Sequence, residues 1–110
     1  MITASVYGRL AADPIERATK AGARMATGLL AADVSGRNTT DHETMWINLA
    51  CFGTAADELL RIPKGVTLNA IGRLTRSHYH KGDEKKESWS LLADSLLTPL
   101  TTHPDHRPQR

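Results

Sequence analysis

The stretch that decides the fold is residues 44–65, TMWINLACFGTAADELLRIPKG. Side chains alternate between two faces along a β-strand. Alternation places four of these residues on one face, Met45, Ile47, Leu49 and Cys51, and four on the other, Trp46, Asn48, Ala50 and Phe52. The first face is apolar and typical of a core, whereas the second carries Asn48, a polar side chain that cores rarely hold. We therefore expect Trp46 and Phe52 to lie on a solvent-facing surface, where they offer flat rings to a ligand.

A short helix is predicted directly after this strand. Thr54, with Asp57 three residues later, has the form of a helix N-cap followed by an acidic first turn. We therefore expect residues 55–61 to be helical. Pro63 ends the helix, because the residue before a proline is disfavoured in helical geometry.

Four further segments are predicted to be strands. Residues 2–10 and 66–74 alternate between two faces, and residues 89–97 form the last strand. The alanine content of residues 23–33 favours a helix, whereas Gly28 and the neighbouring strands favour a strand. We assign residues 23–33 to a strand.

The remaining segments are predicted to be connections. Residues 15–22 are polar and basic and are expected to form a loop or a turn of helix, and residues 34–43 form a polar loop. Residues 75–88 suit a long hairpin that projects from the body. The predicted order of elements is three strands, one helix and two strands. This order indicates an all-β fold, a five-stranded Greek-key barrel of the oligonucleotide-binding (OB) type with one short helix between the third and fourth strands.

The length of the chain indicates one domain. A chain of 110 residues has room for a single core, which we place in residues 1–97, and residues 98–110 are expected to be a disordered tail because they are rich in proline and lack periodicity. The formal charge of +2 is compatible with a polyanionic partner. With a single cysteine, no run of about 20 apolar residues and no signal-peptide pattern, the sequence predicts a cytoplasmic protein.

An ordered set of short motifs, spread over residues 2–97, resembles the bacterial single-stranded DNA-binding protein family. The set comprises Gly8-Arg9-Leu10, Asp13-Pro14, Trp46, Phe52-Gly53, Lys64-Gly65 and Gly72-Arg73-Leu74. The resemblance implies an OB barrel, a homotetramer or dimer associated with the nucleoid, and sequence-tolerant binding and protection of single-stranded DNA in replication, repair, recombination or transfer. It also implies that the stacking aromatic residues are Trp46, Phe52 and Tyr79.

The chain departs from the family pattern at two places. A further stacking tryptophan of the family falls near Gly36, where this chain has no aromatic residue. The family's acidic tail ends in phenylalanine, whereas this chain ends HPDHRPQR, so we expect no tail-mediated recruitment of repair proteins. Two alternative functions are a dimeric accessory factor like primosomal replication protein N, and an OB module that binds a partner protein.

The predicted DNA-binding site combines aromatic rings that stack on bases with cations that pair with phosphates. The cations are Arg9, Arg24, Arg37, Arg73, Arg76 and Lys81. Alternatively, the rings pack under a loop or in a subunit contact. The cations can alternatively be solvated surface residues, and we expect this of Lys85 and Lys86 above all. Tyr7 and Trp89 are left open between core, interface and DNA.

No catalytic residue, metal site or cofactor is predicted. His78 and His80 share a strand face without a third ligand, and the histidines of residues 103–106 lie in the proline-rich tail. Cys51 is expected to be buried and inert. The alternative of a small nuclease rests only on three acidic residues, Asp41, Glu43 and Asp57.

Overall fold

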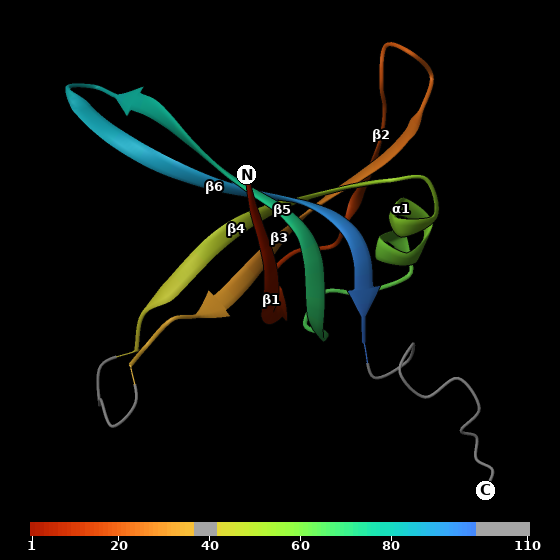
Figure 1. Ribbon diagram of the computed structural model, residues 1–110, viewed down its shortest axis with the longest axis horizontal. Helices are drawn as coiled ribbons and strands as arrows, with labels where there is room; N and C mark the ends of the chain where they lie inside the picture. The colour runs from red at the N-terminus through yellow and green to blue at the C-terminus, as the bar shows by residue number, and fades with distance from the viewer. Residues whose placement is uncertain (37–41, 99–110) are drawn as a thin grey trace, which may run out of the picture.

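The computed structural model describes residues 1–36 and 42–98. They form β1 (Ile2–Leu10), β2 (Ile15–Ala18), β3 (Arg24–Asp33), β4 (Thr44–Phe52), α1 (Gly53–Leu60), β5 (Thr67–Lys81) and β6 (Glu84–Leu97). Figure 1 shows these elements in chain order. The predicted tail lies outside the described residues except for Thr98, which is buried.

Five of the strands close into a ring. β1 pairs with β5, β5 with β6, β6 with β4 and β4 with β3, and β3 returns to β1. The closing contact is short, with Arg9 opposite Ala31 and Leu10 opposite Leu30. The β4–β6 pair is parallel and the other pairs of the ring are antiparallel. The ring, with α1 between its third and fourth strands in chain order, confirms the predicted five-stranded barrel of the OB type.

Two glycines let the backbones of the ring approach closely. A Cβ atom on Gly8 would lie 2.6 Å from the carbonyl oxygen of Ala31, where β1 meets β3. A Cβ atom on Gly72 would lie 2.0 Å from the carbonyl oxygen of Leu92, beside an irregularity in the β5–β6 register. Gly8 therefore allows the close approach of β1 and β3 at the contact that closes the ring.

The core fills the ring and continues under α1. Its largest fully buried side chains are Leu10, Leu30, Leu49, Leu59, Leu68, Leu91 and Cys51. The helix contributes Leu59 together with the buried Ala55 and Ala56, one apolar stripe of a short amphipathic helix. Burial raises the pKa of the Cys51 thiol to about 11, so the thiol stays neutral near pH 7.

Two sequence-based predictions are wrong. Residues 15–18 form β2, a strand paired with the edge of β3, where a loop or turn of helix was expected. All four residues of β2 are exposed, so the strand leaves no hydrophobic alternation in the sequence. The helix begins at Gly53 and its N-cap is Phe52, which makes no side-chain cap. Gly53 turns the chain with φ 60°, so Thr54 already lies inside the helix and Asp57 lies beyond its first turn.

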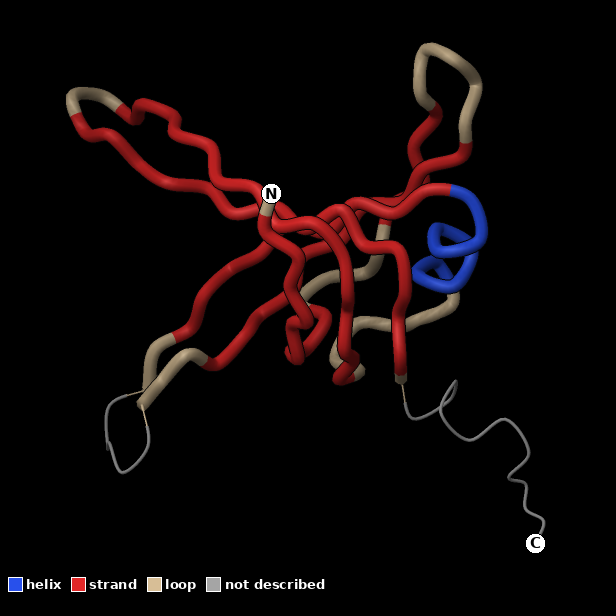
Figure 2. The backbone as a smooth tube through the Cα atoms, viewed as in Figure 1, coloured by secondary structure: helices blue, strands red, loops and turns tan. Residues whose placement is uncertain are grey.

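Two hairpins project from the ring. Figure 1 shows the β5–β6 hairpin at the upper left and the β2–β3 hairpin at the upper right, and Figure 2 shows that both are mostly strand. The predicted β5–β6 hairpin is confirmed, and its two strands pair as far as Lys81 and Glu84. Within the described residues no helix is long and apolar enough to cross a membrane.

Candidate nucleic-acid interface

The outer face of β4 carries two exposed aromatic rings. Trp46 is 54% exposed and Phe52 is 43% exposed, whereas Ile47, Leu49 and Cys51 are buried. The predicted orientation of the strand is therefore confirmed. At about 3.3 Å per residue, six residues separate the two rings by about 20 Å along the strand.

The neighbouring strands leave the indole of Trp46 accessible. Its partner on β3 is Ala31, and the partner of Ala31 on its other side is Arg9 of β1. A small residue therefore lies between the indole and the guanidinium. The ring closure thus places Arg9, one of the predicted cations, on the same outer face as Trp46.

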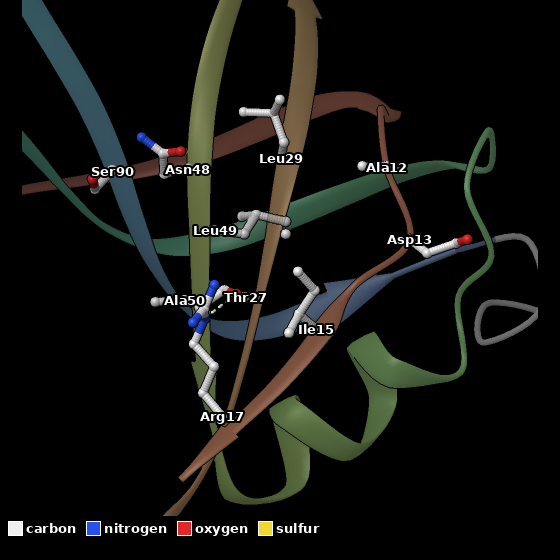
Figure 3. Close-up of a pocket in the computed structure, with 11 residues that line it drawn as sticks. Ala12, Asp13, Ile15, Arg17, Thr27, Leu29, Asn48, Leu49, Ala50 and Ser90 are labelled. Carbon is white, nitrogen blue, oxygen red and sulfur yellow. Dashed lines mark hydrogen bonds between the residues drawn. The ribbon is translucent and has the colours of Figure 1, made fainter. Parts of the chain in front are cut away.

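A hollow of roughly 360 Å³ is lined by Asn48 and Ala50 (Figure 3), which alternate with Trp46 and Phe52 on this face of β4. Its lining residues come from the segment before β2, from β2, β3 and β4, and from β6, and include Asp13, Ile15, Arg17, Thr27, Leu29, Asn48 and Ser90. The Arg17 Nε–H donates to Thr27 Oγ1 across 3.2 Å. We call this concavity the β2 hollow, because β2 forms the wall that the sequence did not predict.

Phe52 also borders a second hollow, of roughly 290 Å³, which it shares with Arg73 of β5. Leu92 and Asp94 of β6 also line this second hollow. The structure therefore brings a predicted stacking ring and a predicted cation to one concave surface, which suits a base next to its phosphate.

Tyr79 lies on the projecting β5–β6 hairpin and is 49% exposed. Its partner across the hairpin is Lys86, so the two side chains share a face. Lys81 lies two residues further along the same face. The Lys86 ammonium is 2.9 Å from the Glu84 carboxylate. Sequence reasoning assigned Lys86 to solvated surface because acidic residues surround it, and only the register shows that it lies beside Tyr79.

Arg76 lies on the opposite face of the hairpin from Tyr79, because three residues separate them along the strand. Its guanidinium carbon lies 5.9 Å from the centre of the Trp89 ring, and Nη1 is 3.7 Å from Glu87. Trp89 is half-buried and packs against the core. The structure therefore does not bring Arg76 to the face of Trp46, and a role in DNA binding stays a prediction.

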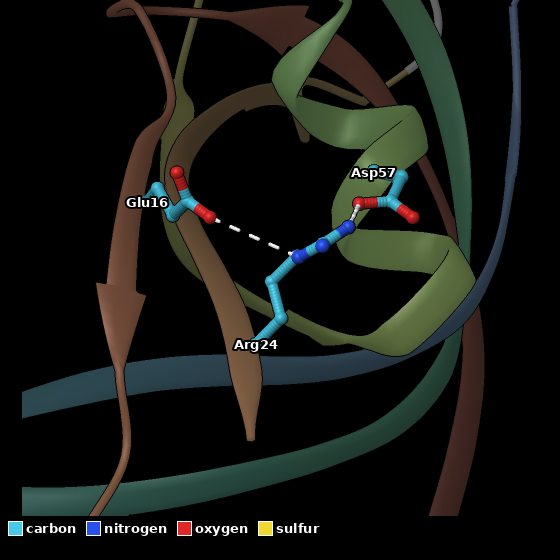
Figure 4. Close-up of polar contacts among 3 residues, drawn as sticks. All are labelled: Glu16, Arg24 and Asp57. Atoms are coloured by element: carbon cyan, nitrogen blue, oxygen red, sulfur yellow. Dashed lines mark hydrogen bonds and ion pairs between the residues drawn. The ribbon is translucent and has the colours of Figure 1, made fainter. Parts of the chain in front are cut away.

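Arg24, the first residue of β3, is held by two carboxylates (Figure 4). Its guanidinium donates a short hydrogen bond to Asp57 of α1 and lies 3.8 Å from Glu16 of β2. The hydrogen bond and the charge of Asp57 raise the pKa of Arg24. The guanidinium thus joins the helix to the β2–β3 hairpin instead of pointing at the rings of β4.

Three further residues, Arg37, Tyr7 and Arg17, complete the comparison with the sequence-based predictions. Arg37 lies outside the described residues. Tyr7 is 71% exposed, which excludes the core, and borders a hollow of roughly 350 Å³ with Arg9 and Asp33. Arg17 was not predicted, because β2 is short and all four of its residues are exposed, so no hydrophobic pattern marks it as a strand.

The nuclease alternative gains no support from the geometry. Glu43 and Asp57 lie beyond opposite ends of β4, and Asp41 lies outside the described residues. Asp57 is also engaged by Arg24. Across residues 1–36 and 42–98, no cluster of three or more His, Cys, Asp or Glu side chains could hold a metal ion.

Residues 1–98 match the sequence model of the single-strand binding protein family. The chain belongs to the single-strand binding protein family. Binding of single-stranded DNA is the activity that this family assignment supports, and the family is one of non-enzymatic DNA-binding proteins. No curated protein sequence matches the chain.

Solved structures show the same fold at low sequence identity. A small single-stranded DNA-binding protein from Streptomyces coelicolor superposes with a TM-score of 0.75 and 18% identity, over 92% of this chain and 96% of that one. A Plasmodium falciparum single-stranded DNA-binding protein in complex with single-stranded DNA gives a TM-score of 0.67 and 20% identity, over 89% and 94%. At these identities the likeness establishes the fold of a single-strand binding protein.

Proposed function

We propose that the protein binds and protects single-stranded DNA in a sequence-tolerant way along the outer face of the ring. Bases stack on Trp46, Phe52 and Tyr79, and Arg9, Arg73 and Lys81 neutralise phosphates. Stacking tolerates different sequences because every base has a flat face. The observation that carries the proposal is the pair of half-exposed rings on β4, on a strand whose other face is core.

The biological setting belongs to the same proposal. Protection of exposed single strands is needed in replication, repair, recombination and transfer of DNA, and the bacterial cytoplasm, with its nucleoid, is where such strands form. The protein acts by binding and carries out no catalysis.

We also propose that the protein works as a homo-oligomer. Along β1, residues Ile2 to Arg9 pair with β5 on one edge. On the other edge, within the described part of the chain, only Arg9 and Leu10 pair. An unpaired strand edge with exposed apolar side chains favours association with a second strand, and Ile2 and Tyr7 are 58% and 71% exposed.

The test is a titration with oligo-dT that follows tryptophan emission. Since the chain has two tryptophans, Trp46→Phe and Trp89→Phe separate their contributions. Trp89→Phe should keep most of the quenching by DNA, and Trp46→Phe should lose it. Quenching that disappears only in Trp89→Phe would place the DNA elsewhere.

Sedimentation of the protein alone tests assembly, and the mass of a single chain at micromolar concentration would contradict the oligomer.

A further inference from the structure

Each aromatic ring of β4 begins a row of three residues that crosses the sheet and ends at an arginine. The rows are Trp46, Ala31 and Arg9 at one end of β4, and Phe52, Met25 and Arg17 at the other end. The third strand is β1 in the first row and β2 in the second. Directly opposite residues of paired antiparallel strands share a face of the sheet. Both arginines therefore lie on the outer face that carries the rings.

The side chain of Arg17 has a defined position on this face. Its Nε–H donates to Thr27 Oγ1 across 3.2 Å, and Thr27 lies on β3 opposite Ala50 of β4. Figure 3 shows the side chain directed from β2 toward these two residues. A guanidinium has five N–H donors, so this hydrogen bond leaves both Nη groups for an anion. Because all of β2 is exposed, an anion can reach them from solvent.

Within residues 1–36 and 42–98, no carboxylate pairs with Arg17. The carboxylate of Glu16, its neighbour in the chain, lies 3.8 Å from Arg24 instead. Asp13 lines the same hollow as Arg17, but its Oδ1 accepts from the backbone N–H of Lys64 across 3.1 Å. Arg17 thus differs from Arg24, which two carboxylates hold, and its charge is available to a ligand.

The residue between the ring and the arginine is apolar in both rows. Ala31 and Met25 are each partly exposed, so no charged group separates a base on the ring from a phosphate at the arginine. Neighbouring strands lie about 4.8 Å apart, which puts the backbone of each arginine about 10 Å from that of β4. The long side chain of arginine can cover part of this distance. A nucleotide whose base stacks on a ring therefore fits with its phosphate on the side of β1 and β2.

We propose that Arg17 is a phosphate-binding residue of the single-strand site, with the role at Phe52 that Arg9 has at Trp46. The single strand then follows β4, with its bases on the rings and its phosphates on the side of β1 and β2. Arg73 lies on the other side of Phe52, toward β6, and contacts a different phosphate. This inference rests on the proposed function and adds to it a residue and a path for the strand.

The experiment measures the affinity for oligo-dT over a range of salt concentrations. Arg17→Ala should bind roughly five- to ten-fold more weakly than wild-type protein at about 50 mM salt. Its slope of log K against log salt should be shallower by about 0.7, the value for one phosphate contact on a single strand. Lys20→Ala is the matched control, because Lys20 lies in the turn of the same hairpin, beyond the last β2–β3 pair, Ala18 and Arg24. It should keep the wild-type affinity and slope.

Two further variants distinguish a phosphate contact from a contact with a base. Arg17→Lys keeps the charge and should keep the wild-type slope, whereas Arg17→Gln keeps a hydrogen-bond donor without the charge and should behave like Arg17→Ala. Since Arg17 is exposed on a strand at the edge of the sheet, the melting temperature of all three variants should stay close to that of wild-type protein.

The outcomes separate this inference from the proposed function. A wild-type slope in Arg17→Ala or Arg17→Gln overturns the phosphate contact while single-strand binding stands. A loss in Lys20→Ala equal to that in Arg17→Ala also overturns it, because net charge would then explain both. Failure of wild-type protein to bind oligo-dT overturns the proposed function and the inference together.

Discussion

Adjacent residues of β4 have opposite energetic roles. Trp46 is 54% exposed, whereas Ile47, its neighbour in the chain, is 3% exposed. Free energy of folding scales with the apolar area removed from water, so the indole contributes less to folding than its size suggests. Its free surface is available to a base instead.

Trp46→Ala should therefore weaken binding of oligo-dT by about 1–3 kcal/mol and leave the melting temperature nearly unchanged. Ile47→Ala is the matched control on the other face. It should lower the free energy of unfolding by about 2–5 kcal/mol, because it leaves a cavity in the core. Titration and thermal melting of both variants measure the two effects. A large fall in the melting temperature of Trp46→Ala would contradict the assignment of the indole to DNA binding.

The residues that sequence reasoning placed least well are cations, because a guanidinium reaches several partners and the sequence does not show which one is near. Arg73 shares a hollow with Phe52, as the proposed site requires. Arg24 instead meets a carboxylate from α1, 33 residues away in the chain. The sequence did not show that β5 continues to Lys81. Once this is known, the alternation of side chains along β5 places Arg76 and Tyr79 on different faces of the hairpin.

At the scale of the element, hydrophobic alternation identified β1, β4 and the first part of β5, because each has one face in the core, whereas β3 was assigned to a strand from Gly28 and the neighbouring strands. Alternation failed for β2, whose four residues are all exposed and whose place is set by pairing with β3. Since β2 forms one wall of the β2 hollow, the sequence identified the aromatic rings but not the concavity beside them.

The contact between β1 and β3 depends on Gly8. Gly8→Ala should separate the two strands and lower the free energy of unfolding by about 1–3 kcal/mol, the usual cost of overpacking, since the new Cβ would lie 2.6 Å from a backbone oxygen. Gly36→Ala is the control, because no atom lies within 4 Å of its added Cβ. Denaturant unfolding measures both. Equal stability of the two variants would show that the ring tolerates a wider β1–β3 spacing.

At the scale of the whole molecule, the two proposed components of the site lie on different strands of one surface. The rings of Trp46 and Phe52 belong to β4, while Arg9 and Arg73 belong to β1 and β5. The sequence contains all four residues, but only the closed ring places them on one outer face. A DNA strand that contacts both components therefore crosses several strands of the barrel.

Salt dependence tests whether these cations act on phosphates. Each phosphate that a cation neutralises releases counterions, so log K should fall linearly with log salt by about 0.7 per contact on a single strand. Arg73→Ala should make the slope shallower by about that amount, because Arg73 is exposed beside Phe52. Arg61→Ala removes the same charge from the end of α1, away from the rings, and should leave the slope unchanged. Equal slopes in the two variants would mean that net charge, rather than the position of Arg73, sets the affinity. A binding constant of the wild-type protein that does not change over a tenfold range of salt would contradict phosphate neutralisation altogether.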